Sequence, residues 1–245
     1  MTSSKEPNSK FYSHINGTQE QLLDRLAVAE ICKGWPVYRD ASEWHNFRNL
    51  FAEKATVWTS NIDDFIQVSK DGKDKGAFIM HRECGTLVEL NGNRAVAKMK
   101  ATITQRFSIP SNTQTQDSQL ATPAPDDGSS ADNIEFDVDC DCRFIFFCEK
   151  NNQGEWKTYF VKLDYDKDKV VPADGRRAPI FPTAELAKYP EGYKFLGAAQ
   201  AMLGYKIDLS LPTPRNEYWW MLYSCMERWL DNAGSDDKDA GLFWE

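Results

Sequence analysis

The chain has 245 residues, and its content of 41% hydrophobic and 13% aromatic residues is sufficient for the core of one globular domain. Its formal charge of -8 at pH 7 disfavours nucleic acid and anionic membrane surfaces as partners, because both carry negative phosphates. No apolar run approaches the roughly 20 residues that span a bilayer, and the N-terminal sequence lacks the apolar region of a signal peptide, so a cytoplasmic location is expected.

Polar residues dominate positions 1–16, which are predicted to form a flexible leader before the first helix. Thr18 and Gln21 have the spacing of a capping box, in which each side chain bonds to the other residue's backbone N–H. Apolar residues then recur at helical spacing as far as Ile31, which predicts a helix of about four turns. A Gly-Trp-Pro sequence should end or kink this helix, because proline lacks the backbone donor. Asp40 would therefore lie just past a helix end.

Ser42 is the expected N-cap of a second, short helix. The inward face of this helix would carry Trp44, Phe47, Leu50 and Phe51. Residues 55–60 are predicted to form a short strand. The charged segment 61–76 is predicted to contain a short helix and a loop.

A long antiparallel hairpin is predicted just after His81. Residues 84–90 form its first strand, Asn91-Gly92 its tight turn, and the following apolar and β-branched run its second strand, as far as Phe107. Residues 109–134 are rich in Pro, Ser, Thr, Asp and Gln, so they are predicted to be a disordered insertion between two paired strands. Two further strands, joined by a turn near Gly154, complete a meander of at least four antiparallel strands.

The charges on the two strands that flank the insertion support their pairing. One face of the first strand carries Lys98, Lys100, Thr102, Thr104 and Arg106, and one face of the second carries Asp137, Asp139 and Asp141. In an antiparallel pair these rows can lie opposite each other, which stabilises the sheet. The interior would then be formed by Ala97, Met99, Ala101 and Ile103 against Val138, Cys140, Cys142, Phe144 and Phe146. The aspartates are therefore interpreted as strand alternation rather than as a calcium site.

The six cysteines are expected to stay reduced in the cytoplasm. Structural zinc needs four converging ligands, and the chain has no CxxC pair and no His near Cys140 and Cys142. They are interpreted as small buried hydrophobic residues. The sequence also lacks the GxSxG, Walker, GxGxxG and HExxH motifs, so neither a metal nor a cofactor is expected.

Residues 171–245 are predicted to form a helical extension that packs on the same domain as residues 17–170. A Pro-rich loop precedes two short helical stretches, which are separated at Pro190. A last amphipathic helix carries an apolar face of Tyr218, Trp219, Leu222, Cys225, Met226 and Trp229. This face must be buried against the sheet, over a pocket mouth or in a partner.

The order of helix, Asp turn, short helix, strand and curved meander resembles the nuclear transport factor 2-like superfamily, in particular its SnoaL-like and scytalone-dehydratase-like members. Asp40 is followed four residues later by Trp44, as in the catalytic segment of scytalone dehydratase. His81 falls where that family has a histidine that works with the Asp. The resemblance covers about residues 20–108 and 136–165. It implies an α+β cone fold, in which N-terminal helices pack on the concave face of a curved antiparallel sheet, here with a C-terminal helical extension.

Two positions depart from the family pattern. The family's second histidine would fall at Thr104, which strand alternation directs outward, and the tyrosine directly before the Asp is Arg39 here. Tyr38 lies one residue from that tyrosine position. The family's own substrate is therefore not expected, while the broader proton-transfer chemistry remains open.

Asp40 and His81 also have structural interpretations, as a turn residue that caps the next helix and as a half-buried histidine at a strand entry. The chain has three histidines, and His14 lies in the leader while His45 lies on the exposed side of a short helix. The functional hypothesis is a hydrogen-bonded Asp40–His81 pair, in which the carboxylate orients the imidazole and favours its protonated form. His81 would remove a proton alpha to a carbonyl or donate one to a departing hydroxyl.

An apolar pocket is expected to be lined by Tyr38, Trp58, Met99, Ile103 and Cys142. The sequence thus predicts a cofactor-independent dehydratase, isomerase or cyclase that acts on an aromatic or polyketide-like small molecule of secondary metabolism. The alternative is a non-catalytic ligand-binding or oligomerising member of the same fold, in which the histidine is structural. A homodimer is implied only by the resemblance.

Overall fold

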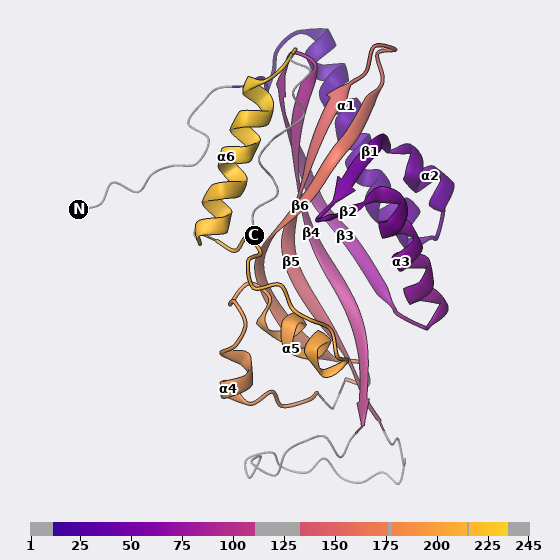
Figure 1. Ribbon diagram of the computed structural model, residues 1–245, viewed down its shortest axis with the longest axis vertical. Helices are drawn as coiled ribbons and strands as arrows, with labels where there is room; N and C mark the ends of the chain where they lie inside the picture. The colour runs from indigo at the N-terminus through magenta and orange to yellow at the C-terminus, as the bar shows by residue number, and fades with distance from the viewer. Residues whose placement is uncertain (1–11, 111–132, 176–177, 215, 235–245) are drawn as a thin grey trace, which may run out of the picture.

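The computed structural model describes residues 12–110, 133–175, 178–214 and 216–234, which form helices on both sides of one long twisted sheet (Figure 1). The elements in chain order are α1 (Gln19–Gly34), the π-helical turn η1 (Trp35–Arg39), α2 (Trp44–Asn49), β1 (Phe51–Val57), β2 (Ser60–Asn61), α3 (Ile62–Asp74), β3 (Ile79–Asn91), β4 (Arg94–Pro110), β5 (Asn133–Lys150), β6 (Trp156–Pro172), α4 (Thr183–Leu186), α5 (Lys194–Met202) and α6 (Glu217–Asp231).

The six strands form one open sheet with the order β2-β1-β6-β5-β4-β3. Neighbouring strands are antiparallel except β1 and β6, which run parallel. The predicted α+β cone-type fold is confirmed, with the difference that its sheet is mixed. β1 and β6 are far apart in the sequence, so no tight turn joins them and their parallel pairing is possible.

The first helix forms as its sequence predicts. The Oγ1 atom of Thr18 accepts a hydrogen bond from the backbone N–H of Gln21, and the Gln21 side chain accepts one from the backbone of Thr18. After α1 the chain continues as the turn η1 and does not stop, because Pro36 at the start of that turn needs no helical partner for its nitrogen. The N-cap of α2 is Glu43, so the prediction of Ser42 was wrong. Ser42 has a φ of 62°, whereas an N-cap has extended backbone angles.

The strand predicted at 55–60 starts earlier than expected. Phe51, which the helical stripe had assigned to the second helix, pairs with Thr158 of β6 and begins β1. This pairing is long-range, so local spacing does not reveal it. The charged segment that follows contains α3, whose N-cap Asn61 accepts a hydrogen bond from the backbone N–H of Asp64 at 2.9 Å.

The predicted pairing across the insertion is confirmed residue by residue. The polar pairs are Thr102 with Asp141, Thr104 with Asp139 and Arg106 with Asp137, each joined by a side-chain hydrogen bond of 2.6–2.8 Å. Both strands also extend beyond their predicted ends, to Pro110 and back to Asn133, and Ile109 and Ile134 of the predicted insertion are buried. The rest of that insertion, 111–132, lies outside the described residues.

Helices cover both faces of this sheet (Figure 1). One face forms the main core with α1, η1, α2, α3 and α5, and it includes the predicted interior rows of β4 and β5. The other face packs on α6 through Val96, Ile145 and Phe147, which contact Leu222, Met226 and Trp229. Among the described helices, none is both long and apolar enough to cross a membrane.

Candidate functional site

Asp40 and His81 meet on the main-core side of the sheet. Oδ1 of Asp40 accepts a hydrogen bond from Nδ1 of His81 at 2.8 Å, and Oδ2 accepts one from the backbone N–H of His81 at 2.6 Å. Asp40 ends the turn η1, whereas His81 lies within β3 and not ahead of the hairpin. One carboxylate thus holds both the ring and the backbone of a histidine that is only 8% exposed.

The surroundings of His81 favour its neutral form. Burial lowers the pKa of His81 below its ordinary 6.5, and the charges of Arg39 and Lys73 lower it further. The hydrogen bond and charge of Asp40 raise this pKa, as expected, but the net direction is downward. Burial therefore outweighs the effect of Asp40, which by itself favours the protonated form as the sequence predicted. Because the carboxylate accepts from Nδ1–H, the neutral ring carries its lone pair on Nε2.

Lys73, near the C-terminal end of α3, holds the turn that carries Asp40. Its Nζ donates hydrogen bonds to the backbone carbonyls of Arg39 and Asp40, at 3.2 Å and 2.5 Å, and to Oγ of Ser42 at 2.9 Å. Ser42 lies in the left-handed region of backbone space, which is costly for a residue with a Cβ and is often associated with functional sites. The sequence alone did not single out Lys73, because it is one of several lysines in a segment of mixed composition that shows no motif.

We expect the substitution Lys73→Met to lower the free energy of unfolding by about 1–2 kcal/mol, because it removes three donors from one charged group. Chemical denaturation measures this loss. Lys75→Met is the matched control on the same helix end, because Lys75 is exposed. Equal stability of the two variants would contradict a positioning role for Lys73.

Aromatic side chains enclose the Asp40–His81 pair. Trp35 is completely buried, and its ring lies 6.2 Å from that of His81 in an edge-on arrangement. Phe144 approaches the imidazole from the sheet at 5.6 Å. The ring centres of Trp35 and Trp58 are 6.3 Å apart, so Trp35 lies between the imidazole and the second indole.

The five residues expected to line a pocket are all on this side of the sheet, but in different environments. Met99 and Cys142 are fully buried core residues, and Tyr38 and Ile103 are half-buried against the same core. Ile103 is the direct register partner of His81 across β3 and β4. Trp58 is half-buried and has a φ of 54°, a strained conformation for a bulky residue.

Of these five, Trp58 lines a cavity of about 350 Å³ between β6 and the C-terminal extension. The remaining lining residues are a mixture of apolar, neutral polar and charged side chains: Thr59, Lys162, Leu163, Tyr165, Tyr193, Leu196, Gln200, Lys206, Ile207, Asp208, Ser210, Leu211 and Pro212. Tyr193 is anchored by donating its hydroxyl proton to the carbonyl of Asp208 at 2.8 Å. The extension therefore supplies half of a pocket next to the aromatic wall of the pair.

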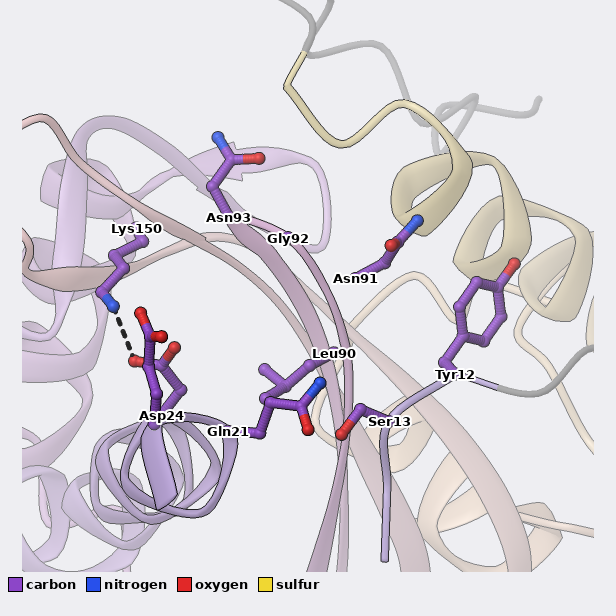
Figure 2. A pocket seen from close by; sticks show the side chains of 10 residues that line it. Tyr12, Ser13, Gln21, Asp24, Leu90, Asn91, Gly92, Asn93 and Lys150 are labelled. Atoms are coloured by element: carbon purple, nitrogen blue, oxygen red, sulfur yellow. Dashed lines mark ion pairs between the residues drawn. The ribbon is translucent and has the colours of Figure 1, made fainter. Parts of the chain in front are cut away.

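A second cavity, of about 490 Å³, lies between the start of α1 and the β3–β4 turn (Figure 2). Figure 2 shows the ion pair between Nζ of Lys150 and Oδ1 of Asp24, which are 2.8 Å apart. The same oxygen accepts a hydrogen bond from Nε1 of Trp156. Neither Asp40 nor His81 lines this cavity or the smaller one.

The cysteines and acidic residues do not form a metal centre within the described ranges. All six thiols are free, and five of them are buried while Cys84 is exposed. In the part of the chain that the structure describes, no three His, Cys, Asp or Glu residues converge as a metal site.

Several fungal proteins are similar to this chain over most of its length. Pea pathogenicity protein 2 and a PEP2-like protein, both from Fusarium vanettenii, are each 40% identical over 231 residues, or 88% of this chain and 89% of theirs. An uncharacterized protein of Emericella nidulans is 38% identical over 240 residues, covering 90% of this chain and 92% of that protein.

Among solved structures, a candidate scytalone dehydratase of Novosphingobium aromaticivorans is 14% identical, with a TM-score of 0.44 over 68% of this chain and 99% of that one. The type 2 hexachlorocyclohexane dehydrochlorinase LinA is 7% identical, with a TM-score of 0.44 over 67% and 97%. The family model described as a SnoaL-like domain matches residues 20–158, a range that contains both Asp40 and His81. By this match, the chain belongs to the SnoaL-like domain family.

Proposed function

We propose that this chain is a cofactor-independent proton-transfer enzyme, a dehydratase, isomerase or cyclase, with Asp40 and His81 as its acid/base pair. The observation that carries the proposal is the binding of one carboxylate to both the ring and the backbone of a buried histidine. This arrangement orients Nε2 as the basic atom. Known members of the fold include dehydratases and isomerases.

In the proposed step, Nε2 of His81 takes a proton from a carbon next to a carbonyl group. The electron pair of the broken C–H bond moves to the carbonyl oxygen and forms an enolate, and His81 becomes an imidazolium that Asp40 stabilises. Return of the proton to another carbon completes an isomerisation. In a dehydration, the electron pair of the enolate forms a C=C bond while the β C–O bond breaks, and the proton on His81 leaves with the hydroxyl as water.

The 350 Å³ cavity is the proposed substrate site. Trp58 belongs to its lining and contacts Trp35, which contacts His81, so a substrate must displace these rings to reach Nε2. The largely aromatic and aliphatic walls fit an apolar, polyketide-like carbonyl compound with a few polar groups. Such compounds are typical of secondary metabolism.

The test is hydrogen exchange at the alpha carbon of a panel of aryl ketones and β-hydroxy ketones in deuterated buffer, followed by NMR. We expect exchange or elimination with at least one compound, and no exchange above background with a protein that carries His81→Ala. Binding of panel members in the cavity without exchange of any proton would contradict the enzyme assignment.

The pH dependence of this reaction follows from the environment of His81. Because the base must be neutral, kcat/KM should fall at acid pH with an inflection below 6.5, the ordinary histidine pKa.

The same lowered pKa makes the stability of the fold depend on pH. The imidazole of His81 binds a proton more tightly in the unfolded chain than in the folded one. The contribution of His81 to stability is therefore complete above pH 6.5 and is lost as the pH falls through the lowered pKa. A pH–rate profile with an inflection above 6.5 would contradict the lowered pKa of His81.

A second candidate function is ligand binding or oligomerisation without catalysis. The close aromatic packing around His81 favours it, because Trp35 and Phe144 occupy the space where a substrate would have to lie. In that case the cavity at Trp58 binds a ligand or a partner's side chain, and the imidazole is structural. Sedimentation analysis together with the exchange assay distinguishes the two candidates.

A further inference from the structure

Three buried N–H groups next to the Asp40–His81 pair have no hydrogen-bond acceptor among the described residues: Nε1 of Trp35, and Nε and Nη1 of Arg39. The Trp35 side chain is completely buried, and Arg39 is 8% exposed. Folded proteins rarely leave buried donors unsatisfied, because these donors have given up their bonds to water. Their presence beside a reactive pair indicates a place for an acceptor.

The two residues share one aromatic cluster with the imidazole. The Arg39 guanidinium carbon lies 5.8 Å from the ring centre of Phe65, and that ring lies 5.5 Å from Trp35, which contacts His81. Nη1 of Arg39 lies 3.5 Å from Oδ1 of Asp40, the distance of a long ion pair, whereas Nε of Arg39 and Nε1 of Trp35 have no such contact.

The buried side-chain atoms of Trp35 and Arg39 that lack a hydrogen-bond partner are all N–H donors. The other buried side-chain atoms of the described residues that lack a partner are carboxylate oxygens, of Glu89, Asp164 and Asp168. These three residues lie on β3 and β6, whereas Arg39 lies in η1. The ligand that completes the site must therefore bring an acceptor, and a positive guanidinium favours a negatively charged oxygen.

We infer that Arg39, together with the indole N–H of Trp35, binds the oxygen anion that forms on the substrate. The inference rests on the proposed proton transfer at His81. When the C–H bond breaks, the proton goes to Nε2 of His81 and the electron pair to the carbonyl oxygen. The resulting enolate oxygen accepts hydrogen bonds from Arg39, and such preorganised donors stabilise the charge as it develops. Substrates are thus carbonyl compounds that enolise, and aromatic carboxylates of similar shape are expected to bind as mimics.

The test compares two probes with the same ring system, the anion 2-naphthoate and the neutral ketone 2-acetonaphthone, by calorimetry on the full chain. We expect the native protein to bind 2-naphthoate more tightly. Arg39→Gln should weaken 2-naphthoate about 10- to 100-fold, the range for a lost charge-assisted hydrogen bond, and change 2-acetonaphthone less than about 2-fold. Arg39→Lys should be intermediate, because lysine keeps the charge but not the planar donors. Arg82→Gln, on the exposed residue next to His81, is the matched control.

A second measurement uses the native protein and does not depend on the folding of a variant. The side-chain N–H resonances of Arg39 and Trp35, assigned with Arg39→Lys and Trp35→Phe, should move on titration with 2-naphthoate. Equal affinity of the native protein for both probes, or 2-naphthoate binding that leaves these resonances unmoved, overturns the inference. Failure of the proposed function has a different signature. If His81 is not the base, His81→Ala keeps the turnover of the native protein, whatever the affinity for 2-naphthoate.

Discussion

Replacing His81 with alanine is expected to lower turnover about 10²- to 10⁴-fold, the usual contribution of one well-placed general acid or base. In the proposed reaction the imidazole is the base that takes the proton, and alanine leaves no base in its position. The measurement is kcat on whichever panel compound shows the fastest alpha-proton exchange. His45→Ala is the control, because His45 is exposed and bonds only to Asn49 among the described side chains.

Asp40→Asn tests the partner of the same pair. Asparagine keeps the size of the side chain but loses the negative charge, so it no longer selects the Nδ1–H tautomer or stabilises the imidazolium. We expect a loss of kcat close to that of His81→Ala, and a double variant no slower than the worse single one, because the two residues act as a unit. Unchanged turnover in both single variants would remove the acid/base assignment.

The largest stability effect is expected for Trp229→Ala in α6. Trp229 is completely buried, its Nε1 donates to the carbonyls of Ala95 at 3.1 Å and Cys148 at 3.2 Å, and the Arg94 guanidinium lies 4.2 Å from its ring centre. Alanine leaves a cavity and removes these contacts, so we expect the free energy of unfolding to fall by about 3–5 kcal/mol. Urea denaturation followed by circular dichroism measures it.

Met221→Ala, on the exposed side of the same helix, is the control for Trp229→Ala. A truncation there should change stability by less than about 0.5 kcal/mol. A single cooperative transition in both proteins would indicate that α6 unfolds with the sheet. If Trp229→Ala instead lost α6 while the rest of the chain kept its full stability, the helix would be an independent attachment.

Much of the fold was predictable because it depends on short-range patterns. The capping box at Thr18 and Gln21 needs only side chains one turn apart. The β4–β5 pairing was readable because strand alternation placed threonines and Arg106 opposite aspartates and left apolar rows on the other face. The limits of these elements were less predictable, since Phe51 enters a strand only through its pairing with β6.

The candidate site also has features that the sequence predicts and features that depend on the fold. Asp40 and His81 could be selected from the residues alone, since few imidazoles are present and the chain order resembles a known family. The three-dimensional arrangement was needed to see that one carboxylate binds both the ring and the backbone of His81, that burial lowers the pKa of the imidazole, and that the Trp35 ring packs beside it. The roles of Arg39 and Lys73 also emerged only there, because burial and unsatisfied donors depend on which distant segments the twisted sheet brings together.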